Sequence, residues 1–81
     1  MNTMIGNDTL VSLGVGQRGV VTALATEGIG RRRMLDLGFI PGTIVESVRR
    51  SPAGDPTAYF IRGVMIALRS EESSKIFVNP V

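Results

Sequence analysis

Three consecutive arginines, Arg31 to Arg33, are the residues of this chain whose type and spacing best suit binding chemistry. Arginine carries a planar, permanently charged guanidinium that forms paired hydrogen bonds with carboxylates and phosphates. Eight of the nine basic residues are arginine, so this chemistry dominates the positive charge of the chain. The run has two interpretations: a solvated helix face, or a docking patch for carboxylates or phosphates.

The side chains that most enzymes use are absent or scattered. The sequence has no His and no Cys, which removes the commonest general base, the thiolate nucleophile and the usual transition-metal ligands. The seven acidic residues are spread along the chain, and oxygen ligands alone would hold a divalent cation weakly. Glu71 and Glu72 are adjacent, but we expect them to favour the start of a short helix. The sequence therefore predicts a protein that is not an enzyme and carries no cofactor.

Glycines at positions 14, 16 and 19 match the spacing G-x-G-x-x-G. The dinucleotide-binding version of this motif lies between a strand and a helix inside a βαβ unit. Here the next residues, Val20 to Thr22, are strand formers, and the chain is too short for that fold. We interpret the motif as a glycine-rich turn that leads into a strand.

Short apolar stretches punctuated by glycine and proline predict an all-β sandwich or barrel. Strands are expected at 20–25, 43–49, 59–62, 64–69 and 76–78. Arg62-Gly63 would form a tight hairpin turn, and Ser70 would be the N-cap of one helical turn before the last strand. With a helix at 31–37, the pattern predicts a mostly β, small SH3-like five-stranded barrel with one short α-helix inserted after the first strand. A closed barrel would leave no exposed sheet edge.

The end of the predicted helix has a geometric explanation at each position. Gly38 suits the left-handed conformation just past the helix, and Phe39 would pack back on Met34 in a Schellman-type cap. The next four residues, 40–43, predict a type II turn with Pro41 second and Gly42 third. The contact made by the cap favours a core position for Phe39, as it does for Leu37.

The 81 residues allow one domain, which we place at 9–81 after a flexible N-terminus at 1–8. The longest apolar runs have the length of a strand, far short of the roughly 20 residues of a membrane-spanning helix. The first residues lack the pattern of a signal peptide. We therefore expect a cytoplasmic protein.

Four segments together resemble a known family: LVSLGVGQRGVVTAL, RRRMLDLGFIPGTIVESVRR, GDPTAYFIRG and VMIALRSEESSKIFV. They resemble the pattern of the FeoA family, the small cytoplasmic component of bacterial ferrous iron uptake, over about residues 9–79. That family is similar to the SH3-like C-terminal domain of DtxR-type iron-dependent repressors, which agrees with the predicted barrel.

The resemblance implies a non-enzymatic accessory protein that binds and regulates the FeoB permease through its cytoplasmic GTPase domain. It would lie at the periphery of the inner membrane through that partner, and any binding of Fe(II) or another divalent cation would be weak. The expected partner-binding residues are the three arginines and the segment after the helix: Arg31, Arg32, Arg33, Gly38, Phe39, Ile40, Pro41 and Gly42.

Two other classes stay open. The arginine content also fits a small nucleic-acid-binding barrel, although the aromatic residues Phe39, Tyr59, Phe60 and Phe77 do not form an obvious stacking platform. The chain could also be a stand-alone SH3-like domain of a DtxR-type regulator that binds a peptide. The low aromatic content counts against the groove that proline-rich peptides need.

Overall fold

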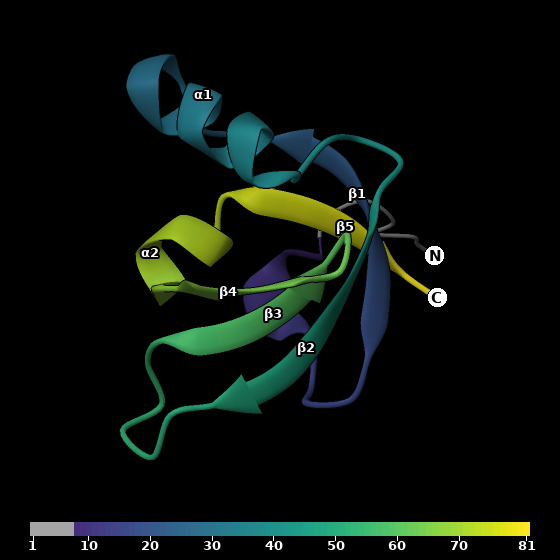
Figure 1. Ribbon diagram of the computed structural model, residues 1–81, viewed down its shortest axis with the longest axis vertical. Helices are drawn as coiled ribbons and strands as arrows, with labels where there is room; N and C mark the ends of the chain where they lie inside the picture. Colours follow the sequence, from purple (N-terminus) through teal and green to yellow (C-terminus); the bar gives the residue numbers. More distant parts are fainter. Residues whose placement is uncertain (1–7) are drawn as a thin grey trace.

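One antiparallel sheet of five strands, in the order β4-β3-β2-β1-β5, forms the body of the protein (Figure 1). The computed structural model describes residues 8–81. Alternating buried and exposed residues in the strands place one face of the sheet on the core. The elements in chain order are η1, a 3₁₀ turn (Leu10–Ser12), β1 (Arg18–Leu24), α1 (Gly28–Leu37), β2 (Ile44–Arg50), β3 (Thr57–Ile61), β4 (Val64–Leu68), α2 (Ser70–Ser73) and β5 (Ile76–Pro80).

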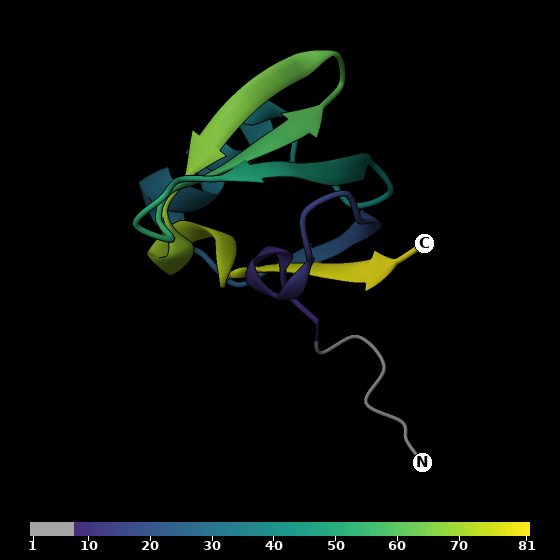
Figure 2. The same cartoon turned by 90° about the horizontal axis from the view of Figure 1, so that it is seen from below.

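These elements confirm the predicted five strands, the helix after the first strand and the helical turn before the last. The predicted closure of the barrel is wrong, because β4 and β5 each pair with one neighbour only and remain sheet edges within residues 8–81. Register shifts at Thr22 in β1 and Val48 in β2 bend the sheet. Viewed from below, β4 and β5 lie on opposite sides of the molecule (Figure 2). In a closed barrel, β4 would pair with β5. Here the short helical segments η1 and α2 contact each other instead.

The predicted N-terminal segment, 1–8, lies outside the described residues except for Asp8. The carbonyl of Asp8 accepts a hydrogen bond of 2.9 Å from the Val78 N–H, and Thr9 forms an isolated bridge with Phe77. Residues 8 and 9 therefore cover the outer edge of β5. No helix of the described chain has the length and apolar character needed to cross a membrane.

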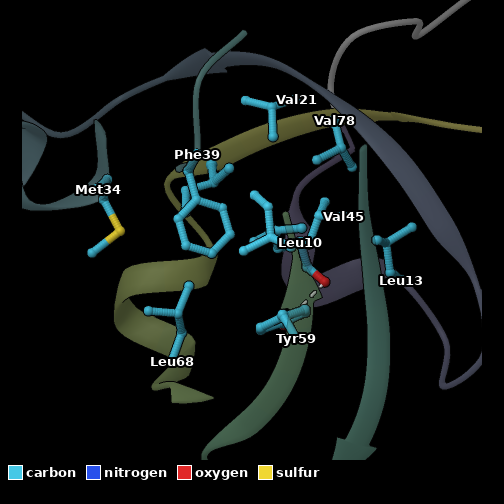
Figure 3. Close-up of a cluster of buried hydrophobic side chains, with 11 residues drawn as sticks. Leu10, Leu13, Val21, Met34, Phe39, Val45, Tyr59, Leu68 and Val78 are labelled. Atoms are coloured by element: carbon cyan, nitrogen blue, oxygen red, sulfur yellow. Dashed lines mark hydrogen bonds between the residues drawn. The ribbon is translucent and has the colours of Figure 1, made fainter. Parts of the chain in front are cut away.

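The core lies between the inner face of the sheet and the helical segments (Figure 3). Tyr59 is buried there, and its hydroxyl donates a 3.3 Å hydrogen bond to the Leu10 carbonyl. Burial raises the pKa of Tyr59, because the phenolate would lose its hydration. The other buried apolar side chains are Leu10, Leu13, Val21, Met34, Phe39, Val45, Ile61, Leu68, Ile76 and Val78.

Candidate docking surface

The first six residues of α1, Gly28–Arg33, are all exposed. We call this segment the arm. It projects away from the sheet (Figure 1), and the side chain of Ile29 is 89% exposed. The helix begins three residues before the predicted start, so the arginines occupy its second turn. The helix dipole acts mainly on the first turn and disfavours cations there, so its cost to these three arginines is small.

The other end of α1 is fixed by the predicted cap. Gly38 has φ 110° and ψ 1°. Its N–H donates to the Leu35 carbonyl at 3.0 Å, and the Phe39 N–H donates to the Met34 carbonyl at 3.0 Å. These two bonds define a Schellman motif. The buried side chains of Met34 and Phe39 join the core, so the cap and the core position predicted for Phe39 are confirmed.

The chain then reverses in the predicted type II turn. Thr43 donates to the Ile40 carbonyl at 2.9 Å, and Gly42 in the third position has φ 99°. The Gly42 N–H also donates to the Val21 carbonyl at 2.7 Å, and the Val21 N–H donates to the Thr43 carbonyl at 2.9 Å. These bonds fix the turn on β1. We call residues 38–42 the elbow, and its outer surface consists of the exposed residues Ile40, Pro41 and Gly42.

The predicted site residues separate into four groups, one of which is the exposed elbow residues Ile40, Pro41 and Gly42. Arg31 and Arg32 are exposed and make no salt bridge within residues 8–81. Arg33 pairs with Glu72 of α2. Gly38 and Phe39 are buried, so they position the elbow and offer no surface of their own to a partner. The arm lies at the start of α1, and the exposed elbow residues follow the end of the same helix.

Glu72 links α1 to α2 through its two carboxylate oxygens. Oε2 pairs with Arg33, while Oε1 accepts a 3.2 Å hydrogen bond from the Arg69 N–H at the start of α2. Arg32 and Asp36 lie four residues apart on α1 and form no ion pair within residues 8–81, where the ion pairs are Arg33–Glu72 and Arg69–Asp55. The base of the arm is thus tied to a segment 39 residues later in the chain.

The predicted N-cap role of Ser70 is wrong. Ser70 is the first residue of α2, and Arg69 occupies the cap position. The carboxylate of Asp55, in the loop between β2 and β3, accepts a 2.8 Å hydrogen bond from the Ser70 N–H. A carboxylate from a distant loop therefore performs the capping that a local serine would provide in an isolated helix.

Sequence reasoning missed two residues of this surface. Ile29 lies before the predicted start of the helix and has glycine on both sides. Arg62 forms a two-residue turn with Gly63, and both residues have positive φ, as the predicted hairpin requires. The side chain of Arg62 lies over Gly38, where its Cδ is 3.1 Å from the position of an added Cβ. Besides the three arginines of the arm, the surface therefore includes Arg62, which lies beside the carboxyl end of α1. The helix dipole favours positive charge at that end.

The described residues hold no group of three metal-ligating side chains and no pocket. Among the four aromatic residues, Phe39 and Tyr59 are buried, Phe77 is half-buried and Phe60 is exposed. A single exposed ring cannot form the row of stacked bases that single-strand binders use. The exposed features of this surface are the arginines of the arm and the residues Ile40, Pro41 and Gly42 of the elbow.

Comparison with known proteins places this geometry in a family. The FeoA domain model matches residues 9–80. A Porphyromonas gingivalis protein described as an "Fe(2+) transport protein A/Fe(2+) transporter FeoB fusion protein" is 33% identical over 70 residues. That match covers 86% of this chain and 8% of the relative, so the chain spans a small part of the fusion protein.

Two solved structures extend the comparison. The FeoA protein of Chlorobium tepidum is 35% identical, with a TM-score of 0.83, over 89% of this chain and 69% of that one. The Stenotrophomonas maltophilia FeoA, described as a procaryotic SH3 domain protein complexed with zinc, is 28% identical, with a TM-score of 0.80 over 89% of each chain. The SH3-like class is therefore confirmed.

A manganese-dependent transcriptional repressor shares the fold alone, at 15% identity and a TM-score of 0.84 over all of this chain and 39% of the repressor. The family model spans nearly the whole described chain, including the arm and the elbow. This chain belongs to the FeoA family.

Proposed function

We propose that this protein is a non-enzymatic accessory component of bacterial ferrous iron uptake that binds and regulates a FeoB-type permease. The observation that carries the proposal is the Porphyromonas gingivalis relative, whose name joins an Fe(2+) transport protein A and the transporter FeoB in one protein. A covalent link keeps two domains at high effective concentration, which is useful where the two parts act together. We place the present chain in the cytoplasm, at the periphery of the inner membrane, against the GTPase domain of the permease.

The arm and the elbow are the proposed contact. Arg31 and Arg32 are free to form bidentate bonds with carboxylates of a partner. Ile29 and Arg32 are three residues apart and so share a face of the helix, which combines an apolar anchor with a charge. Because the elbow is fixed by backbone hydrogen bonds, the protein loses little conformational entropy when a partner binds there.

The test is the affinity of the full chain for the cytoplasmic GTPase domain of the permease from the same organism, measured by calorimetry. The variant Arg31→Gln/Arg32→Gln should bind about tenfold more weakly at low salt, a loss of about 1.4 kcal/mol. The difference should shrink at high salt, which screens exposed charges. Replacing all three arginines should weaken binding further and leave the fold intact, although Arg33 would also lose its pair with Glu72.

The matched control is Arg49→Gln/Arg50→Gln, which removes two exposed arginines at the far end of β2. It changes the net charge by the same amount and should keep the wild-type affinity. Equal binding by both double variants at low salt would contradict the docking surface. No binding by the wild-type chain, with or without nucleotide on the GTPase domain, would contradict the proposed partner. Regulation is tested separately, by the rate of GTP hydrolysis with and without this protein.

A further inference from the structure

The outer edge of β4 is an unpaired strand. β3 and β4 form a hairpin in which Ile61 and Val64 flank the two-residue turn, and such flanking residues exchange both hydrogen bonds. By the alternation of antiparallel pairs, Ile66 and Leu68 also bond to β3, so the N–H and C=O groups of Met65 and Ala67 point away from the sheet. None of these four groups has a hydrogen-bond partner among residues 8–81.

This edge has none of the features that keep sheet edges apart. Proteins protect edges with charged residues, proline, bulges or a covering segment. β4 has the sequence VMIAL, without a charge or proline, and pairs with β3 in unbroken register. Val64 and Met65 are 54% and 48% exposed. The strand lies uncovered at the outside of the hairpin (Figure 2).

We propose that β4 pairs in antiparallel orientation with β4 of a second copy of this chain, which joins the two sheets into one across a two-fold axis. A two-fold interface requires a surface that is complementary to itself. With the axis at Ile66, all five residues of the strand are paired. Met65 lies opposite Ala67 of the second copy, so a large side chain meets a small one on each side of the axis. The four free backbone groups of each copy then bond to those of the other.

The charges at the two ends of β4 favour the same arrangement. Arg62 precedes the strand and Glu71 follows it, and neither has a salt bridge within residues 8–81. Arg69, also at the far end, is already paired with Asp55 at 4.0 Å. The axis at Ile66 places Arg62 opposite Ser70 of the second copy, beside that copy's Glu71. Each end of the paired strands thereby gains an opposite charge. The interface is small, so the dimer is reversible and dissociates on dilution.

The proposal is tested first by sedimentation equilibrium of the full chain from micromolar to millimolar concentration. Wild-type protein should form dimers, and Ala67→Lys should raise the dissociation constant about tenfold or more, because lysine is a residue that blocks edges. Thr22→Lys is the control: it adds the same charge at an exposed position of β1, which is an interior strand of the sheet. It should leave the dimer intact.

A second measurement reads the register directly, because the chain has no cysteine. Single variants Met65→Cys, Ile66→Cys and Ala67→Cys are oxidised under mild conditions and compared by the rate of cross-linking. Ile66→Cys should cross-link fastest, since only residue 66 faces its own equivalent across the axis.

A chain that stays monomeric throughout the concentration range would overturn the proposal. So would a dimer that survives Ala67→Lys and is lost in Arg31→Gln/Arg32→Gln. A monomer whose binding to the permease domain is abolished by Ala67→Lys would instead assign the edge to a strand of the permease.

Discussion

The two edges of the sheet differ in what lies against them. The outer edge of β5 is covered by Asp8 and Thr9, which contribute a backbone hydrogen bond and an isolated bridge. The outer edge of β4 is bare within residues 8–81, although its residues are at least as apolar. η1 holds the covering segment in place, because Leu10 directly follows Thr9 and is buried in the core. Substitutions near the covered edge should therefore change the free energy of unfolding. Substitutions on the bare edge should change the dissociation constant of the proposed dimer.

The largest effect is expected where the covering segment is anchored. Leu10→Ala removes a fully buried side chain and should lower the free energy of unfolding by about 2–5 kcal/mol, the range for large-to-small core substitutions. The measurement is urea denaturation followed by circular dichroism. The control is Val11→Ala, at a neighbouring exposed position, where a change within about 0.5 kcal/mol is expected. If the two variants lost equal stability, η1 would not be the anchor of the covered edge.

An intermediate effect is expected beside the turn from which the bare edge starts. Gly38 has φ 110° and lies under the side chain of Arg62. Gly38→Ala should lower the free energy of unfolding by about 1–2 kcal/mol, because an L-residue is strained in the left-handed conformation.

Gly30→Ala is the matched control within α1. Its added Cβ would make an ordinary contact, 3.8 Å from Cβ of Thr26, and alanine stabilises a helix by roughly 0.5–1 kcal/mol relative to glycine. Opposite signs for the two substitutions in the same denaturation assay would show that strain at the cap controls the result. A loss in both would mean that the helix tolerates no added side chain.

The smallest effect concerns the hydrogen bond that joins β3 to η1. Tyr59→Phe removes the bond to the Leu10 carbonyl and should cost about 0.5–1.5 kcal/mol at neutral pH. Burial raises the pKa of Tyr59 in the folded protein, while a tyrosine in the unfolded chain has a pKa of about 10. Above that pH the unfolded state binds fewer protons than the folded state, so stability falls as the pH rises.

Tyr59 is the sole tyrosine of the chain, which makes the alkaline measurement specific. Urea denaturation at neutral pH and above pH 10 should show a larger loss for wild-type protein than for Tyr59→Phe. The absorbance of tyrosinate provides an independent reading, and it should appear together with unfolding. Ionisation at about pH 10 without loss of structure would contradict the burial of this hydroxyl beside η1.

The parts of the fold that sequence reasoning predicted are those set by neighbouring residues. The Schellman cap at Gly38 and the type II turn at Pro41-Gly42 each depend on a few consecutive residues, so the local pattern of residue types specifies them. The features that it did not predict depend on distant contacts. Asp55 replaces Ser70 as the cap of α2 from 15 residues away.

The candidate site shows the same division. Sequence patterns identified Arg31 and Arg32, because a run of three arginines is itself a local signal. They could not separate Arg33 from its neighbours, since its pairing with Glu72 joins α1 to α2 across the fold. Ile29 lies before the predicted helix, where flanking glycines disfavour a helical conformation, and the anchored end of α1 outweighs that preference. The lack of pairing between β4 and β5 likewise depends on contacts between segments far apart in the chain, such as the contact of η1 with α2.

The exposure of the arm has an evolutionary consequence. Its six residues contribute no buried side chain, so most substitutions there should alter the free energy of unfolding by less than about 0.5 kcal/mol. Met34, the elbow and the pair between Arg33 and Glu72 fix the direction of the helix. Selection can therefore change the binding preference of this segment while the stability of the domain stays nearly constant, which lets one scaffold follow a partner as that partner's surface diverges.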